Sequence, residues 1–181
     1  SSPYYLFHPA VPRRLAALLP EARLIVLLRD PVRRAYSHYW HERDKGRETL
    51  DFEAAIAAEP ERIGRAHERL ADDTLGYSHA HQHFSYLARG RYAEQLEHWF
   101  ATIPPERFHM IRFEDLAEHP LVALNGTLAT LGLPPAESVD LEPRNTRRYP
   151  PMAAATAERL RDYFAPHNRR LEALLGRPMG W

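Results

Sequence analysis

The chain has 181 residues, 44% of them hydrophobic, so it is long enough to form one folded domain, residues 1–181, with its own core. Its 24 basic and 24 acidic side chains leave no net charge, which argues against a nucleic-acid-binding protein. There is no cysteine, no apolar run of membrane-spanning length and no visible signal peptide, so a cytoplasmic protein without a transmembrane segment is expected. Lys45 is the only lysine and has no glycine cradle, so these residues hold no lysine-containing phosphate loop.

The first strong pattern lies between residues 11 and 44. A short helix is expected at Val11–Leu19, followed by a strand at Leu24–Leu28 whose five aliphatic residues are typical of a parallel strand buried on both faces. Asp30 can cap a second helix, and Pro31 suits its first position. The apolar residues of this helix fall at helical spacing and predict a stripe packed on the sheet: Val32, Ala35, Tyr36, Tyr39 and Trp40.

A polar row lies on one flank of the same helix. Arg33, Ser37 and His41 are spaced by four residues. Ligands of open α/β sheets bind beyond the carboxyl ends of the strands, where Arg29 offers the planar donors that suit phosphate and Ser37 can add a hydrogen bond. Taken alone, the two residues also fit a strand-end arginine paired with a surface carboxylate and a solvated serine.

The middle of the chain is less regular. A helix is expected to begin near Asp51 and to be interrupted at Pro60, and residues 65–85 are expected to form a long loop or broken helix over the edge of the sheet. His79, His81 and His83 alternate as zinc ligands on a strand could, but no cysteine or well-placed carboxylate completes a set. We therefore predict no metal site.

The second half repeats the alternation of helix and strand. A helix follows Gly90, a strand is expected at Phe108–Arg112, and another helix follows it. Glu114 and Asp115 begin this last helix, so N-capping explains them better than acid/base catalysis. A polar loop then leads to two final helices broken near Pro166. This order predicts an α/β fold.

Several stretches, in this order, carry a resemblance to a known family. The chain resembles the sulfotransferases of the heparan-sulfate type and their bacterial relatives over nearly its whole length. The resemblance implies a P-loop-NTPase-like three-layer α/β/α fold with a mostly parallel sheet, and 3'-phosphoadenosine-5'-phosphosulfate as the donor, without a metal ion. The stretches are LIVLLRDPVRRAYSHYWH, YLARGRYAEQLEHWF, IRFEDLAEHPLVALNGTLATLGL, NTRRYPPM and FAPHNRRLEALLGRPMGW.

The resemblance also assigns roles to residues. It places Arg29 and Ser37 on the 3'-phosphate of the donor, and His41 near the acceptor with a part in catalysis; the alternative for His41 is a surface histidine beside Glu42. A loop that covers the phosphates corresponds to Asn145, Thr146, Arg147, Arg148 and Tyr149. Two of these depart from the family pattern, in which Asn145 would be a lysine and Thr146 a glycine.

The expected function is transfer of a sulfuryl group from this donor to a hydroxyl or amine of a carbohydrate, lipid or small natural product, with adenosine 3',5'-bisphosphate as the other product. The alternative is a catalytically inactive nucleotide-binding or scaffolding module of the same fold; a nucleotide kinase would not explain the spacing of Arg29 and Ser37. The family's phosphosulfate loop, its strand and the main catalytic base are expected upstream of Ser1, because Ser2, Pro3 and Tyr5 resemble the segment that follows that base.

Overall fold

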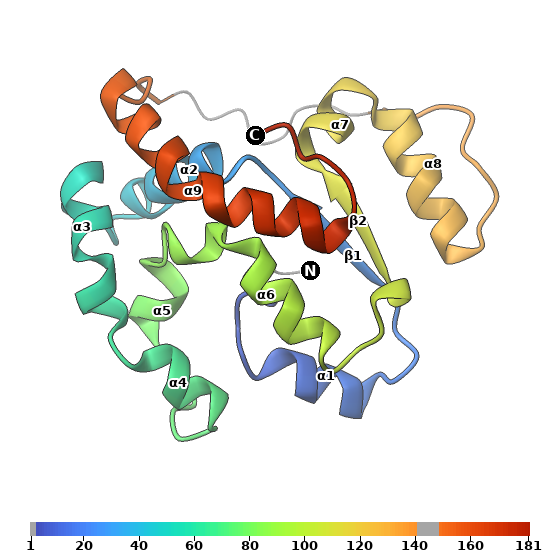
Figure 1. Cartoon of the computed structure of the whole chain (residues 1–181), viewed down its shortest axis with the longest axis horizontal. Helices are drawn as coiled ribbons and strands as arrows, with labels where there is room; N and C mark the ends of the chain where they lie inside the picture. Colours follow the sequence, from blue (N-terminus) through green and yellow to red (C-terminus); the bar gives the residue numbers. More distant parts are fainter. Residues whose placement is uncertain (1–2, 141–148) are drawn as a thin grey trace.

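The computed structural model describes residues 3–140 and 149–181, and Figure 1 shows the arrangement of their helices and strands. Two strands, β1 (Leu24–Leu28) and β2 (Phe108–Arg112), form a parallel pair in which Leu24 faces Phe108 and Leu28 faces Arg112. Both strands have the predicted bounds. The α-helices are α1 (Val11–Leu18), α2 (Pro31–Asp44), α3 (Phe52–Ile63), α4 (Ala66–Ala71), α5 (His79–His83), α6 (Tyr92–Phe100), α7 (Phe113–Glu118), α8 (Pro120–Leu131) and α9 (Ala154–Leu175).

The strands are covered by helices, which confirms the predicted α/β class. Val26 and Leu28 of β1 and Met110 of β2 pack into one apolar cluster with Leu96 of α6 and Leu171 of α9. In Figure 1 these two helices run side by side across the strands, while α7 and α8 lie beyond β2. Two short 3-10 turns complete the described part, η1 (Ala88–Gly90) before α6 and η2 (Pro105–Arg107) before β2.

The prediction that β1 is buried on both faces is wrong. Ile25 and Leu27 are each 48% exposed, and no residue of β2 is fully buried. Successive side chains of a strand point to opposite faces, so Val26 and Leu28 meet α6 and α9 while Ile25 and Leu27 point the other way. On that side the helix α8 packs against β2, where Thr130 Oγ1 lies 3.0 Å from His109 Nδ1.

Helix α2 forms as the sequence predicts. The Asp30 carboxylate accepts hydrogen bonds from the amides of Val32 (2.8 Å) and Arg33 (3.2 Å), and Pro31 takes the first helical position. The predicted apolar stripe packs into a second cluster, which also contains Phe52 of α3 and Phe164 of α9. The cap therefore fixes where the helix begins, and the stripe fixes which side of it faces the core.

Two predicted helix breaks do not occur. Helix α3 continues through Pro60 to Ile63, and α9 is one helix that includes Pro166. An interior proline removes one hydrogen bond and costs about 3 kcal/mol. Burial on both sides of Pro166 offsets this cost, because Phe164 and Leu171 are fully buried against neighbouring elements.

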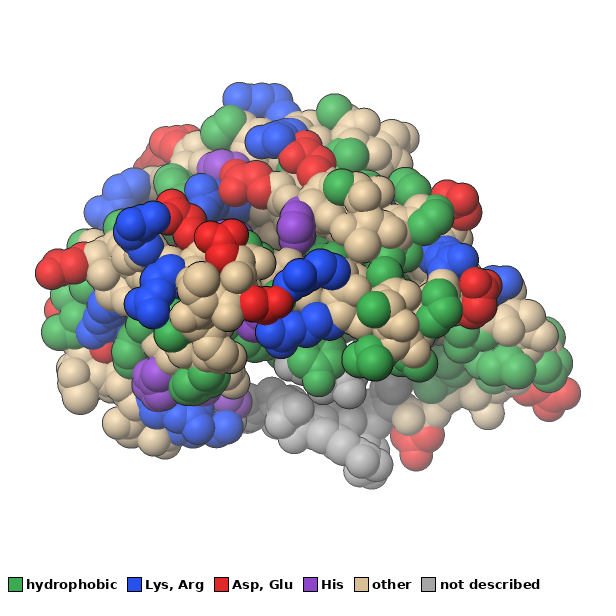
Figure 2. Space-filling model, turned by 90° about the horizontal axis from the view of Figure 1, so that it is seen from below, with side chains coloured by type: hydrophobic (Ala, Val, Ile, Leu, Met, Phe, Trp, Pro, Cys, Tyr) green, Lys and Arg blue, Asp and Glu red, His purple; other side chains and the backbone are tan. Residues whose placement is uncertain are grey.

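Residues 65–85 form a broken helix, α4 and α5, which confirms this one of the two predicted alternatives. In Figure 1 this segment lies beside α3 and away from the strands, so its predicted position over the sheet edge is wrong. Within the described ranges, no helix is long and apolar enough to cross a membrane. The face shown in Figure 2 has basic and acidic side chains interspersed, as the zero net charge leads one to expect.

Candidate functional site

Arg29 stands directly after β1, at the carboxyl end of the parallel pair. Its backbone carbonyl accepts a hydrogen bond from the Tyr92 hydroxyl (2.9 Å), and its guanidinium lies 4.9 Å from the centre of the Phe113 ring. The Arg29 Nε atom is buried and has no hydrogen-bond partner among the described residues. A positioned guanidinium whose donors are not used by a carboxylate can bind a phosphate group.

The neighbouring acids join the two strand ends. One Glu114 oxygen accepts the Asp30 amide (3.1 Å) and the other accepts the Trp181 indole N–H (3.3 Å), while Asp115 lies 3.4 Å from Arg112 Nε. Neither acid caps α7, whose first residues have no side-chain cap, so the predicted capping role is wrong. Glu114 instead connects β1, β2 and the chain end around Arg29.

Ser37 and His41 lie further along α2, one helical turn apart. Ser37 is half-buried, whereas the His41 side chain is 42% exposed with its Nε2 atom 3.9 Å from Glu42 Oε1. One helix carries both residues and begins two positions after Arg29, so Ser37 lies about two turns and His41 about three turns from the strand end.

The end of the polar loop contacts the same helix. The Tyr149 ring stacks on Trp40 (centroids 5.8 Å apart, 7° between planes) and meets Tyr36 edge-on at 5.4 Å, and the Tyr36 hydroxyl donates to the Pro150 carbonyl (2.9 Å). Tyr149 is thus adjacent to the helix that carries Ser37 and His41. The other predicted loop residues lie outside the described residues: Asn145, Thr146, Arg147 and Arg148.

Sequence reasoning missed the role of Glu42, a buried carboxylate on α2. Its oxygens lie 3.0 Å from Arg47 Nη1, 3.2 Å from His83 Nδ1 and 3.7 Å from His38 Nε2. Burial alone would raise the pKa of Glu42, but the contacts from His38, Arg47 and His83 hold it at about 2. Burial also lowers the pKa of His38, to about 3, so Arg47 supplies the positive charge at neutral pH.

The spacing of Arg34, His38 and Glu42 could have revealed this group. The three residues follow each other at intervals of four and form a second polar row on α2, beside the row of Ser37 and His41. Arg47 is close in the sequence, but His83 and Tyr86 are far away, so the spacing indicates the row on α2 and not its distant partners. Glu42 therefore links the helix of the candidate site to α5.

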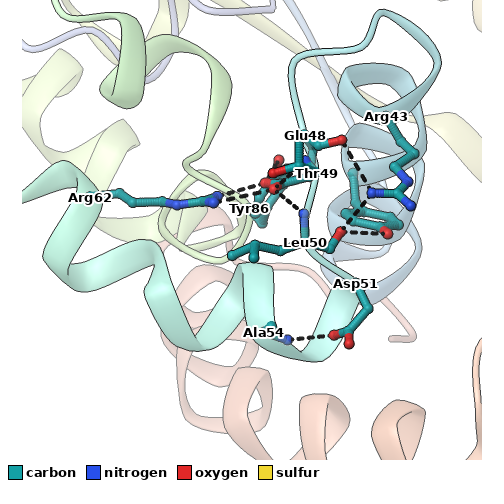
Figure 3. A network of polar contacts seen from close by, with 9 residues as sticks. Arg43, Glu48, Thr49, Leu50, Asp51, Ala54, Arg62 and Tyr86 are labelled. Atoms are coloured by element: carbon teal, nitrogen blue, oxygen red, sulfur yellow. Dashed lines mark hydrogen bonds and ion pairs between the residues drawn. The ribbon is translucent and has the colours of Figure 1, made fainter.

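A second buried carboxylate anchors the loop after α2. Figure 3 shows Glu48, whose side chain is 0% exposed, between Arg62 of α3 (2.6 and 3.2 Å) and the Tyr86 hydroxyl (2.8 Å). It also accepts the amides of Thr49 and Leu50, each at 2.9 Å. Burial alone would raise the pKa of Glu48, but these hydrogen bonds, above all those from Arg62, lower it. This network ties the end of α2 to α3.

The alternating histidines lie on the short helix α5 rather than on a strand. His81 is buried, and its ring nitrogens contact the Tyr4 hydroxyl (2.7 Å) and His67 Nδ1 (3.0 Å). Phe7 stacks on the same ring at 4.4 Å. In the described part of the chain no group of three or more His, Asp or Glu side chains is arranged to hold a metal ion. The His81 ring therefore serves to join α4, α5 and the first residues.

The parallel strands and the helices that cover them define an α/β protein with an arginine at the end of its first strand. A model of the sulfotransferase family matches residues 2–137, three quarters of the chain, so the chain belongs to this family. The crystal structure of a sulfotransferase from Alicyclobacillus acidocaldarius is 32% identical and superposes with a TM-score of 0.73, covering 97% of this chain and 63% of that one. The resemblance seen in the sequence is confirmed.

Two curated relatives extend this comparison. The membrane-associated sulfotransferase of Dictyostelium discoideum is 27% identical over 100% of this chain and 52% of its own length. The bifunctional heparan sulfate N-deacetylase/N-sulfotransferase of Drosophila melanogaster is 30% identical over 94% of this chain and 18% of its own length. The chain thus spans about half the length, or less, of these two relatives.

Proposed function

We propose that residues 1–181 belong to a single sulfotransferase domain that transfers a sulfuryl group from 3'-phosphoadenosine-5'-phosphosulfate to a hydroxyl or amine. The observation that carries this proposal is the Arg29 guanidinium, held at the end of β1 with a buried Nε that has no partner among the described residues. This arrangement fits an anionic group of the donor. Family membership and the similarity over 97% of the chain to a bacterial sulfotransferase structure support it.

In this proposal Arg29 and Ser37 bind the 3'-phosphate of the donor. The guanidinium donates two parallel hydrogen bonds to phosphate oxygens, and the Ser37 hydroxyl adds a third from α2. Tyr149 and the loop before it, Asn145 to Arg148, cover the phosphates. The stacking of Tyr149 on Trp40 supports this role, because it brings one end of the loop against α2.

His41 would act at the acceptor. Its side chain is 42% exposed, so an acceptor hydroxyl or amine can reach it, and its imidazole can take the proton of that group. A carbohydrate is the favoured class of acceptor, because the Drosophila relative bears the name of a heparan sulfate enzyme; lipids and small natural products are the other classes.

Binding of two nucleotides tests the donor assignment. We expect Arg29→Ala and Ser37→Ala each to weaken binding of adenosine 3',5'-bisphosphate by about 1.5–3 kcal/mol, the effect of losing a hydrogen bond to a charged group. Binding of adenosine 5'-monophosphate, which lacks the 3'-phosphate, should barely change. Calorimetry on the full-length protein measures both, with Arg33→Ala as the control because the Arg33 side chain is 73% exposed on the same helix. Equal losses for the two nucleotides would sink the assignment.

A further inference from the structure

The peptide group that joins Arg29 to Asp30 is held from both sides. It lies directly beyond the last residue pair of β1 and β2. Its carbonyl accepts a hydrogen bond from the Tyr92 hydroxyl (2.9 Å), and its N–H donates to Glu114 Oε1 (3.1 Å). The C=O and N–H groups of a planar trans peptide point in opposite directions, so one contact on each side fixes the peptide plane. The backbone of Arg29 is therefore oriented by two side chains from other elements.

The side chain of Arg29 is held by an aromatic ring instead of an acid. Its Cζ atom lies 4.9 Å from the centre of the Phe113 ring, and its buried Nε has no hydrogen-bond partner among the described residues. An aromatic face attracts a guanidinium without using its N–H groups, whereas a carboxylate would occupy them. Phe113 therefore restricts the guanidinium and leaves its donors available for an anion.

Both oxygens of Glu114 are engaged. One accepts the Asp30 amide, and the other accepts the Trp181 indole N–H (3.3 Å) and lies 3.9 Å from Arg112 Nε. The Trp181 ring also lies 5.9 Å from the Tyr92 ring, so Trp181 contacts both side chains that hold the peptide group. Arg112 offsets part of the carboxylate charge, which by itself would repel a phosphate. Glu114 thus serves as a hydrogen-bond acceptor between the two strand ends.

We propose that Phe113, Glu114 and Tyr92 are positioning residues that fix the orientation in which the Arg29 guanidinium meets the 3'-phosphate of the donor. Phe113 and Glu114 directly follow β2, so the end of one strand orients the arginine at the end of the other. A guanidinium makes two parallel hydrogen bonds to a phosphate only when its plane is correctly oriented, and a side chain already held in place loses less freedom on binding. This inference rests on the proposed function, since the donor supplies the phosphate.

Calorimetry of two nucleotides on the full-length protein tests this role. Phe113→Leu, Glu114→Ala and Tyr92→Phe should each weaken binding of adenosine 3',5'-bisphosphate by about three- to thirtyfold, which is within the range for neighbouring residues that act together. Binding of adenosine 5'-monophosphate should change by less than about twofold. Asp115→Ala is the matched control, because this neighbouring acid is 49% exposed and pairs with Arg112 (3.4 Å). It should retain the wild-type affinity for both nucleotides.

A double-mutant cycle separates positioning from general support of the fold. Each substitution is combined with Arg29→Ala, which leaves no guanidinium to position, so the second substitution should then change bisphosphate binding by less than about twofold. A residue that only supports the fold, or that contacts the nucleotide directly, would weaken binding equally with and without Arg29. That result, or equal losses for the two nucleotides, would overturn the proposal. Phe113→Leu and Tyr92→Phe keep an apolar side chain, so they complete the test if Glu114→Ala does not fold.

The same titrations separate failure of this inference from failure of the proposed function. If Arg29→Ala weakens bisphosphate binding while Phe113→Leu, Glu114→Ala and Tyr92→Phe do not, the donor assignment stands and the positioning role is overturned. If Arg29→Ala has no effect, the donor assignment fails, and the positioning role falls with it. Tighter bisphosphate binding by Glu114→Ala would also overturn the inference, because the carboxylate would then act by repelling the phosphate and not by holding Arg29.

Discussion

Replacing Glu48 with glutamine should destabilise the protein more than the same replacement of an exposed glutamate. Glu48 is fully buried and accepts hydrogen bonds from Arg62, from Tyr86 and from two backbone amides (Figure 3). Each Glu48 oxygen accepts an Arg62 N–H, so whichever way the glutamine amide turns, its NH₂ group faces an Arg62 donor. Only the Tyr86 hydroxyl can reverse and accept, so at least one hydrogen bond is lost and replaced by repulsion.

The size of the expected loss in unfolding free energy follows from the burial of the Glu48–Arg62 ion pair. Removing the charge of one partner of a buried ion pair costs about 3–5 kcal/mol, because the other charge stays behind without compensation. The Arg62 side chain is 23% exposed, so water can partly solvate it and the lower end, about 3 kcal/mol, is expected. Glu53→Gln is the matched control: its ion pair with Arg159 is 48% and 61% exposed, and its loss should cost less than about 1 kcal/mol.

Urea unfolding of the full-length protein at neutral pH measures both losses. A pH series adds an independent readout. The pKa of Glu48 is lowered in the folded state, so its stabilisation is complete above its ordinary value near 4.5 and is lost as the pH falls below it. The free energy of unfolding should therefore fall less steeply below pH 4.5 in Glu48→Gln than in the wild type. Glu53→Gln should change this slope less. A loss for Glu48→Gln no greater than that for Glu53→Gln would refute the reasoning.

Three other predictions follow. His41→Ala should lower turnover roughly ten- to a thousandfold with donor affinity nearly unchanged, which initial rates at saturating donor will show; unaltered turnover would make His41 a surface histidine. Gly90→Ala would place a Cβ 2.6 Å from the fully buried Phe164 ring and should cost about 1–3 kcal/mol in urea unfolding, whereas Gly76→Ala, with nothing within 4 Å, should cost less. His81 has a folded-state pKa lowered to about 3, mainly by burial, so it destabilises the protein as the pH falls from about 6.5 toward 3; His81→Gln should show a shallower loss over this range, and an unchanged slope would contradict the burial argument.

Local chemistry made part of the structure readable from the sequence. Neighbouring residues in the chain determine where the two short strands lie and where helix α2 begins, at Asp30 and Pro31. Both strands and the cap lie where predicted. The family was readable for a related reason, because the order of several local motifs was enough to suggest it. Arg29, Ser37 and His41 were found in the same way, although their roles stay predictions.

The tertiary structure decided what depends on contacts between distant segments. Pro60 and Pro166 were expected to end helices, but packing outweighs one missing hydrogen bond, and the helices continue. Ile25 and Leu27 are as aliphatic as their buried neighbours, yet they are half exposed, because exposure depends on which helices cover each face of the strands.

The polar centres beside the candidate site depend on the tertiary fold most of all. Sequence alone shows Arg34, His38 and Glu42 as charged or polar residues of a helix. No pattern in the nearby sequence predicts that His83 or Arg89 packs against them. Folding brings residues 83–89 against α2 and removes water from the space between them. Burial then strengthens the contacts of Glu42 with Arg47 and His83, because the strength of a charge interaction is set by its surroundings and not by residue type alone.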